Sequence, residues 1–167
     1  MIKVAINGFG RIGRATARHI LESRPDMQLV KINATGDLDT NLHLLKFDSV
    51  HGRFAPPYYP EWSHTRSLAE LDWTGIDVVL ECTGAFNNGE ACKVHLQKGA
   101  RKVVISAPAK NVTRTIVYGV NHNTITANDN IVSNASCTTN CLAPLARVLH
   151  NTVGIQSGIV TTIHAYT

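Results

Sequence analysis

The sequence predicts an α/β protein built on a parallel, doubly wound sheet. Short runs rich in Val, Ile and Leu recur along the chain and often end in a polar or glycine residue, which is typical of strands buried on both faces. The expected strands are Lys3–Asn7, Leu29–Asn33, Asp77–Glu81, Lys102–Ser106, Thr115–Gly119, Asn130–Asn134 and Gly158–Ile163. Helical periods lie between several of them, at Ile12, Thr16 and Ile20 and again from Leu142 to Leu149. Strands that alternate with helices favour this fold class.

Length and composition are those of one globular domain. The 167 residues suffice for one well-cored domain and are too few for two. No apolar run approaches the roughly 18 residues that a membrane span needs, and the start lacks the layout of a signal peptide. The net charge of +4 comes from scattered basic residues, which argues against a nucleic-acid surface. We expect a cytoplasmic protein with no membrane or nucleic-acid partner.

Two parts of the chain depart from the regular pattern. Residues Phe54–Trp73 contain three prolines, two tyrosines and two tryptophans, which predicts an irregular surface excursion with one helical turn at Leu68–Leu71. The chain stops at Thr167, directly after an expected strand and without a closing helix. We interpret this ending as that of a truncated chain.

A glycine-rich loop follows the first expected strand and opens the first expected helix. Its sequence, GFGRIG, fits the G-x-G-x-x-G pattern of dinucleotide-binding loops. In that pattern Gly8 permits a tight turn, Gly10 lets the backbone approach the pyrophosphate, and Gly13 lets helix and strand pack closely. Unpaired N–H groups at the helix start then hold the phosphates. The residues expected to bind the cofactor here are Gly8, Phe9, Gly10, Arg11, Ile12 and Gly13.

The second expected strand ends where a dinucleotide site contacts the ribose. An acidic residue about 20 positions after the last glycine usually accepts the ribose hydroxyls of NAD. Here the chain reads Asn33-Ala34-Thr35-Gly36, and the first acid is Asp37. Without a carboxylate at position 34, a repulsion of up to about 4 kcal/mol against a 2′-phosphate is missing. We expect NADP or dual use, with the Thr35 hydroxyl and the Gly36 N–H receiving the phosphate. NAD use remains the alternative if Asp37 reaches the ribose.

One of the four cysteines has a local reason to be reactive. Cys137 lies between an expected strand and the helical stripe that starts at Leu142, so it falls at a helix N-terminus, where N–H groups and the helix dipole stabilise a thiolate. Ser136 and Thr138 flank it with hydroxyl groups suited to phosphate oxygens. Cys141, one turn further along, is expected to be packed. The spacing of the cysteines is not that of a zinc site, and we expect no metal.

His164 is the candidate base for that thiol. It ends the expected strand Gly158–Ile163. In a doubly wound sheet the carboxyl ends of the strands form the ligand crevice, which is the edge that also presents Gly8–Gly13 and Cys137. Spacing alone leaves open that His164 is an ordinary edge histidine.

Five segments carry a specific resemblance to a known family. They are Gly8–Arg14, His43–Ser49, Ile105–Lys110, Ser136–Cys141 and His164–Thr167. In this order they are similar to segments of the phosphorylating glyceraldehyde-3-phosphate dehydrogenases, and the match runs over nearly the whole chain. The family usually has a carboxylate where this chain has Ala34, and replacements there resemble members that accept NADP.

The resemblance implies a thioester mechanism. Cys137, as thiolate, adds to the aldehyde to give a hemithioacetal, and His164 takes the hydroxyl proton as hydride leaves for the nicotinamide. Inorganic phosphate then cleaves the thioester, so that D-glyceraldehyde 3-phosphate becomes 1,3-bisphosphoglycerate. The resemblance further implies phosphate binding by Ser136, Thr138 and Thr167, cofactor contacts by Thr83, Gly84 and Ser106, and an adenine contact by Arg66.

The resemblance also implies a domain organisation. Residues 1–136 form the dinucleotide-binding (Rossmann) domain, and residues 137–167 begin a catalytic α+β domain with the nucleophile helix and the histidine-bearing strand. The family's second half supplies an arginine for the substrate phosphate, an asparagine for the nicotinamide amide and most contacts of a homotetramer. Since that half is absent from the sequence, we expect the chain alone to bind dinucleotide and to be inactive.

Two other functions remain open. Relatives that act on erythrose 4-phosphate share the cysteine loop, although Leu142–Leu145 and Ala165–Thr167 look more like the glyceraldehyde enzyme. A non-catalytic nucleotide-binding or redox module would use the glycine loop and Cys137 without turnover. Alkylation of Cys137 no faster than that of a model thiol would favour this last reading.

Overall fold

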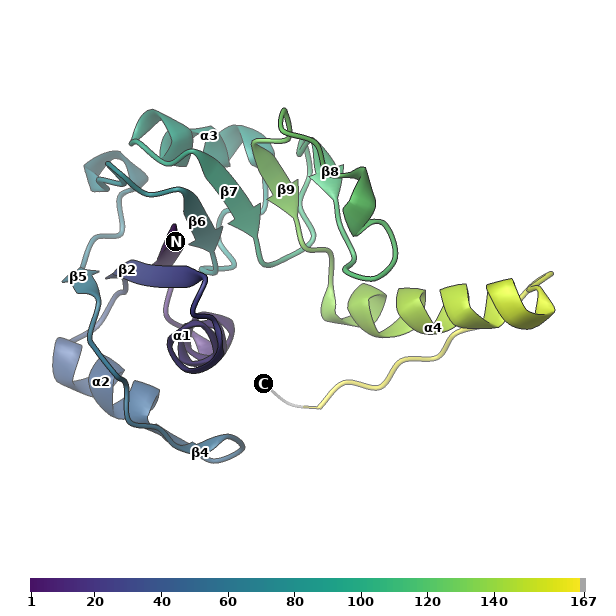
Figure 1. The fold of residues 1–167 in the computed structure, drawn as a ribbon, viewed down its shortest axis with the longest axis horizontal. Coiled ribbons are helices and arrows are strands. Elements are labelled where there is room, and N and C mark those ends of the chain that lie inside the picture. Colours follow the sequence, from purple (N-terminus) through teal and green to yellow (C-terminus); the bar gives the residue numbers. More distant parts are fainter. Residues whose placement is uncertain (166–167) are drawn as a thin grey trace.

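The computed structural model describes residues 1–165 and confirms the predicted parallel sheet (Figure 1). Seven strands follow the spatial order β5-β2-β1-β6-β7-β9-β8, and every pair of neighbours is parallel. The strands are β1 (Ile2–Asn7), β2 (Met27–Asn33), β5 (Glu61–Ser63), β6 (Val78–Glu81), β7 (Lys102–Ile105), β8 (Arg114–Thr115) and β9 (Ile131–Ser133). A separate short hairpin joins β3 (Phe47–Asp48) and β4 (Gly52–Arg53).

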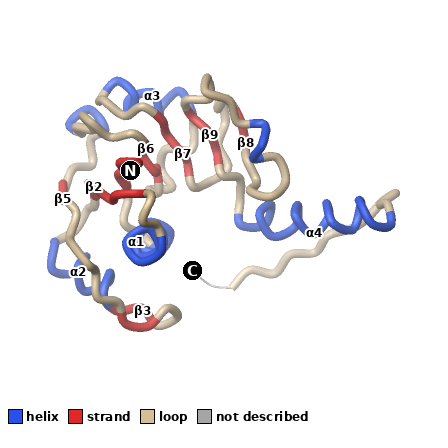
Figure 2. Tube along the Cα trace, viewed as in Figure 1, coloured by secondary structure: helices blue, strands red, loops and turns tan. Residues whose placement is uncertain are grey.

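Helices flank the sheet, as Figure 2 shows in blue. They are α1 (Arg11–Ser23), α2 (Leu38–Lys46), α3 (Gly89–Gln97) and α4 (Cys137–Val153), with 3₁₀ turns at Leu68–Glu70 and His122–Thr124. In Figure 1, α1 and α3 lie on opposite sides of the sheet. This arrangement is the one expected when strands and helices alternate along the chain.

The alternation of side chains along β1 divides the core between the two faces. Val4 and Ile6 pack in one buried cluster with Leu29 of β2 and Ile20 of α1. Ala5, which points to the other face, belongs to a second buried cluster. Near-continuous burial on both faces explains why these strands read as unbroken apolar runs.

The strand order reverses next to β1. From β1 the chain first moves outward to β2 and β5, and then it crosses back to place β6 on the other side of β1. Ligands of open parallel sheets bind outside the carboxyl ends of the strands at such a reversal. The fold therefore predicts a ligand site at the carboxyl ends of β1, β2 and β6.

The expected surface excursion at Phe54–Trp73 is wrong in part. Strand β5 lies within it and pairs with β2, and Trp73 is fully buried in the cluster that contains Ala5. The predicted helical turn is confirmed as the 3₁₀ turn Leu68–Glu70. Prolines and tyrosines suggested a loop, but pairing with β2 places the middle of the segment in the sheet, and burial of the Trp73 ring holds its end in the core.

Two strands expected in the last third of the chain need correction. Of the strand expected at Thr115–Gly119, only Thr115 lies in β8, because the chain then turns back with Val120 and Asn121 bonded to the Val117 carbonyl. Residues Gly158–Ile163 form no strand, since no other strand among the described residues pairs with them, and Ile159 is 98% exposed.

Helix α4 forms as predicted, but its apolar stripe is not covered. No residue of the helix is buried among residues 1–165, and Leu145 and Leu149 are exposed. Figure 1 shows α4 extending away from the sheet, with the following segment running back beside it. The Arg147 guanidinium anchors the helix by donating to the carbonyl oxygens of Gly119 and Val120.

Candidate functional site

A crevice of about 400 Å³ opens at the carboxyl ends of β1, β2 and β6, where the strand order reverses. Seven of the residues predicted to bind the cofactor line it, namely Gly8, Phe9, Gly10, Asn33, Thr35, Arg66 and Thr83. Six others lie outside the lining, namely Arg11, Ile12, Gly13, Ala34, Gly84 and Ser106. Predicted residues from the loop between β1 and α1 and from the end of β6 thus line the same crevice.

Each glycine of the loop has its own steric reason. Gly8 has φ +96°, and a Cβ there would lie 2.6 Å from the Thr83 nitrogen. A Cβ at Gly13 would lie 2.1 Å from the Gly8 carbonyl oxygen. Beside Gly10, in contrast, no atom lies within 4 Å of the Cβ position, although this residue lines the crevice. The space beside Gly10 therefore fits a ligand that touches the backbone.

The N-terminus of α1 faces this space without a competing side chain. Gly10 is its N-cap residue, so no side chain caps the helix, and its first turn contains no acidic residue. The unpaired N–H groups and the positive end of the helix dipole are therefore available to an anion. A pyrophosphate is the group that such a site binds in dinucleotide-binding folds.

The ribose end of the crevice differs from the expectation in detail. Ala34 is 2% exposed and belongs to the apolar cluster around Val4, so its side chain is absent from the lining. Thr35 and Arg66 line the crevice instead, the latter after β5. Asp37 is used elsewhere, because its carboxylate caps α2 by accepting the Thr40 N–H at 2.8 Å. Hydrogen bonds from Thr40 also hold the pKa of Asp37 below its usual range.

Part of the crevice lining was not predicted from the sequence. Asn33 donates to the Asn7 side chain at 2.7 Å and to the Thr65 carbonyl at 2.9 Å, which fixes the segment that presents Arg66. Asn7 ends an otherwise apolar strand at the ligand edge, and this position could have identified it. The lining residues not predicted as site residues are Asn7, Thr65, Leu68, Cys82, Ala85 and Phe86.

Cys82 lines the crevice as well, but its thiol is protected. Burial raises the pKa of Cys82 to about 11, although a hydrogen bond with Ser106 acts in the opposite direction. Ser106, which directly follows the last residue of β7, therefore contacts the Cys82 thiol without lining the crevice. At neutral pH the protonated Cys82 thiol therefore adds no charge to the wall of the crevice.

Cys137 is the first residue of α4, as the sequence predicted. Ser136 is the N-cap, and its Oγ accepts the Thr139 N–H at 3.0 Å. Ala135, just before the cap, has φ +59°, a conformation that costs energy for a residue other than glycine. The Asn140 amide holds this turn by donating to the carbonyl oxygens of Asn134 and Ser136. The thiol is exposed, and helix N–H groups lie behind it.

Contrary to expectation, Cys141 is exposed. It lies one turn after Cys137 on a helix whose residues are all at least partly exposed. The sequence pattern could not show this, because a helical stripe is packed only where another element covers it.

The structure brings His164 to the start of α4. Its Nε2 lies 3.4 Å from the Thr138 hydroxyl and 2.9 Å from the Thr162 hydroxyl. Thr138 directly follows Cys137, so His164 lies at the helix end that carries Cys137, although 27 positions separate the two residues in the sequence. The predicted phosphate ligand Thr167 lies outside the described residues.

Cys137 and the crevice lie at the same edge of the sheet. Cys137 follows the carboxyl end of β9, and the glycine loop follows that of β1, in a sheet whose strands are all parallel. Neither Cys137 nor His164 belongs to the crevice lining. The edge thus combines a cradle for an anionic ligand with a separate exposed thiol.

Two kinds of feature are absent from the part of the chain that the structure describes. Within residues 1–165, no group of three or more His, Cys, Asp or Glu side chains is arranged to hold a metal ion. In the same residues no helix combines the length and the apolar character that crossing a membrane requires.

Sequence comparison relates the chain to known proteins. Residues 2–61 match the family model for the glyceraldehyde 3-phosphate dehydrogenase NAD binding domain, and residues 136–167 match that for the C-terminal domain. The chain is 54% identical to the glyceraldehyde-3-phosphate dehydrogenase of Cereibacter sphaeroides, and 50% and 48% identical to those of Pseudomonas aeruginosa and Clostridium pasteurianum. These alignments cover 99 to 100% of the chain and 54% of each relative, so the chain spans about half the length of the curated relatives it matches.

Proposed function

Since the chain belongs to the glyceraldehyde 3-phosphate dehydrogenase family, we propose that it binds NAD(P)⁺ and carries the nucleophile of a phosphorylating aldehyde oxidation. The substrate is D-glyceraldehyde 3-phosphate and the product is 1,3-bisphosphoglycerate. One observation carries this proposal: a glycine-built crevice and an exposed thiol at a helix N-terminus share one edge of the sheet. The first suits a dinucleotide and the second suits attack on a carbonyl carbon.

In the proposed reaction Cys137 forms the covalent intermediate. Its thiolate adds to the aldehyde carbon, and the hydroxyl of the resulting hemithioacetal gives its proton to His164 as the carbonyl re-forms. A nicotinamide bound in the crevice supplies the acceptor for the hydride that leaves the same carbon. Inorganic phosphate then attacks the thioester, the C–S bond breaks, and the acyl phosphate departs while Cys137 returns to the thiolate.

Hydroxyl groups around Cys137 are proposed to bind the phosphate oxygens. Ser136 Oγ accepts the Thr139 N–H and lies 2.8 Å from the Thr139 hydroxyl. When Thr139 donates in that second bond, the Ser136 O–H can donate to a phosphate oxygen. Thr138 lies between the thiol and His164 and offers a second hydroxyl. Thr167 is proposed as a third on the basis of the sequence.

We propose that NADP⁺ is accepted at least as well as NAD⁺. Three observations support this: the Ala34 side chain brings no carboxylate to the crevice, Asp37 is engaged in capping α2, and Arg66 lines the same crevice as Thr35. A guanidinium beside a 2′-phosphate contributes a charge-assisted hydrogen bond. The missing carboxylate removes a repulsion of up to about 4 kcal/mol.

The proposal extends to the setting of the enzyme. A thiolate nucleophile needs a compartment that keeps it reduced, which supports the cytoplasm. The whole protein is proposed to act as a homotetramer on a small phosphorylated aldehyde and inorganic phosphate. Size-exclusion chromatography with light scattering on the whole protein would contradict the tetramer if it gave the mass of one subunit.

Calorimetric titration of the chain with NAD⁺ and NADP⁺ at one salt concentration tests the cofactor proposal. Comparable or tighter NADP⁺ binding is expected. A clear NAD⁺ preference would refute the NADP proposal and leave dinucleotide binding intact, whereas absence of binding for both would refute the crevice as a dinucleotide site.

A chimera tests the chemistry. The chain is joined to the remaining residues of the Cereibacter sphaeroides relative, and phosphate-dependent formation of NAD(P)H is followed with D-glyceraldehyde 3-phosphate and with erythrose 4-phosphate. Turnover should favour the glyceraldehyde substrate and disappear in C137S. Activity that survives C137S would exclude the thioester mechanism.

A further inference from the structure

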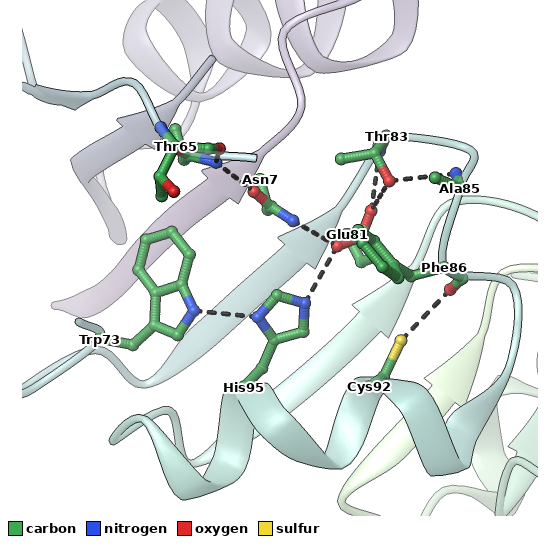
Figure 3. A network of polar contacts seen from close by, with 10 residues as sticks. Asn7, Thr65, Trp73, Glu81, Thr83, Ala85, Phe86, Cys92 and His95 are labelled. Atoms are coloured by element: carbon green, nitrogen blue, oxygen red, sulfur yellow. Dashed lines mark hydrogen bonds and ion pairs between the residues drawn. The ribbon is translucent and has the colours of Figure 1, made fainter. Parts of the chain in front are cut away.

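We propose that the buried carboxylate of Glu81 is a positioning residue that sets the distance between the two walls of the crevice. Glu81 ends β6 and is 1% exposed, and it does not line the crevice itself. It acts through the residues bonded to it (Figure 3). This inference rests on the proposed dinucleotide binding and adds a residue that supports it.

Both oxygens of the carboxylate are fully used. Oε2 accepts the Asn7 amide at 2.6 Å and lies 3.0 Å from His95 Nε2. Oε1 accepts the Thr83 backbone N–H at 2.8 Å and also the Thr83 hydroxyl. Four donors around one buried carboxylate stabilise its charge and explain how an acid can occupy this position.

The proton on His95 is assigned by its other neighbour. The Trp73 indole nitrogen lies 2.9 Å from His95 Nδ1, and an indole N–H only donates. His95 Nδ1 must therefore accept, so the proton of the neutral ring is on Nε2 and points to Glu81. His95 and Trp73 are both fully buried, so water cannot replace the hydrogen bond between them.

Three of the four bonds join the two walls of the crevice, one to Asn7 and two to Thr83. Asn7 belongs to the β1 wall and is itself bonded to Asn33 at the end of β2. Thr83 belongs to the β6 wall, and its hydroxyl accepts the Ala85 N–H at 3.1 Å. Asn7, Thr83 and Ala85 all line the crevice. Glu81 is thus the one side chain of the network that bonds to both walls.

Helix α3 forms hydrogen bonds that hold the β6 wall on the side away from the crevice. His95 of α3 bonds to Glu81, and three residues earlier the Cys92 thiol donates to the Phe86 carbonyl at 3.2 Å. Phe86 lines the crevice next to Ala85. Figure 3 shows both contacts rising from one face of the helix toward the loop after β6. The position of that loop is therefore set by buried polar bonds to the helix as well as by the strand that precedes it.

A neutral amide cannot replace the carboxylate. In E81Q the oxygen can still accept from Thr83, but the new NH₂ group then faces two donors, the Asn7 amide and His95 Nε2. Turning Asn7 over would only move the conflict to Asn33, whose amide donates to the Asn7 oxygen. The mismatch therefore propagates to the crevice walls, while the volume of the core is unchanged.

The test compares E81Q with two other variants of the same chain. H95Q places an amide nitrogen near the position of Nε2 and keeps a donor toward Glu81. I76A removes apolar volume at the opposite end of β6, where Ile76 is buried away from the crevice, and controls for loss of stability. Affinity for NAD⁺ is measured by calorimetry well below each melting temperature, and exchange of the Thr83 amide hydrogen is measured by NMR without ligand.

E81Q should bind NAD⁺ at least about tenfold more weakly, because buried donors lose their acceptor, and its Thr83 amide should exchange at least about tenfold faster. H95Q should stay within about threefold of wild type and I76A within about twofold, even where I76A lowers the melting temperature equally. If E81Q does not fold, T83V, which removes one hydroxyl, should still weaken binding about threefold or more.

Two results would overturn the inference. Wild-type affinity in folded E81Q, or in T83V if E81Q is unfolded, would show that the walls do not depend on Glu81. A loss in I76A as large as that in E81Q would show that stability alone determines affinity. Failure of the wild-type chain to bind NAD⁺ or NADP⁺ would refute the proposed function, and this inference with it.

Discussion

Gly13 lies so close to Gly8 that a Cβ at Gly13 would come within 2.1 Å of the Gly8 carbonyl oxygen. Gly10, between them, has nothing within 4 Å of its Cβ position. One glycine of the loop is therefore required by packing inside the protein, whereas the space beside another is open to a ligand. Substitutions at Gly13 and Gly10 should therefore affect stability and ligand binding separately.

The pair G13A and G10A should show this separation. G13A should lower the melting temperature, because helix α1 must move away from the loop to avoid the Gly8 carbonyl. G10A should melt within about 2 °C of wild type, since an added methyl group meets no atom there, but should bind dinucleotide about tenfold more weakly because it occupies the approach to the backbone. Equal dinucleotide affinity in G10A and wild type would contradict the assigned ligand position.

The four thiols should react in a fixed order. Burial raises the pKa of Cys82 to about 11, and burial together with the Glu81 carboxylate raises that of Cys92 to about 12, whereas Cys137 and Cys141 are exposed. At pH 8 only about one Cys82 in a thousand is then a thiolate. Iodoacetamide followed by peptide mass mapping should label Cys137 and Cys141 first. In guanidinium the order should vanish, and early labelling of Cys82 in the folded chain would contradict its protection.

Arg66 should matter for one cofactor only. R66Q removes a charge that lines the same crevice as Thr35, and it should weaken NADP⁺ binding about tenfold or more while NAD⁺ affinity changes less than about threefold. R101Q makes the same charge change at the opposite edge of the sheet and serves as the control. Equal losses for both cofactors in R66Q would instead indicate a contact to the adenine ring.

Acid should destabilise the chain partly through Asp129. The Arg114 guanidinium, whose Nε lies 2.7 Å from Asp129, and the Thr126 N–H hold the pKa of Asp129 below its usual range. The carboxylate therefore stabilises the fold above the unfolded-state pKa of about 4, and this contribution is lost as the pH falls through the lower folded value. D129N should unfold more readily than wild type at pH 7, and the difference should shrink below pH 4.

D39N provides the comparison for this experiment, since Asp39 is exposed in the first turn of α2. Denaturant unfolding followed by circular dichroism from pH 2 to pH 8 is the measurement. A D129N curve that stays parallel to that of the wild type over the whole range would show that the ion pair does not contribute to stability.

Helix α4 should open more easily than the sheet. No residue of this helix is buried, and residues 155–165 form no regular structure. Amide hydrogens of α4 beyond its first turn should exchange within minutes, while those of β1 and β6, which lie in the middle of the sheet, should be the slowest in the chain. Hydrogen exchange with mass spectrometry measures this, and protection in α4 equal to that in β1 would contradict it.

Local patterns explain which expectations were confirmed. Apolar runs and the glycine spacing predicted β1, β2, β6, β7 and the loop between β1 and α1, because each of these signals is complete within about ten residues. The strand expected at Gly158–Ile163 was wrong, since a strand needs a partner that no local pattern reveals. The expected packing of Cys141 in α4 was wrong for the same reason.

The sequence by itself determined the parallel sheet, the dinucleotide-type loop Gly8–Gly13 and the place of Cys137 at a helix start, since residue type and spacing decide backbone geometry over short distances. Only the tertiary structure placed Arg66 and Thr35 in the lining of one crevice and turned Ala34 into the core. It alone brought His164 to Thr138 and joined Glu81 to His95 and Trp73. These contacts link residues from different elements, and they exist because the packing of the whole sheet fixes where each strand end and helix face comes to lie.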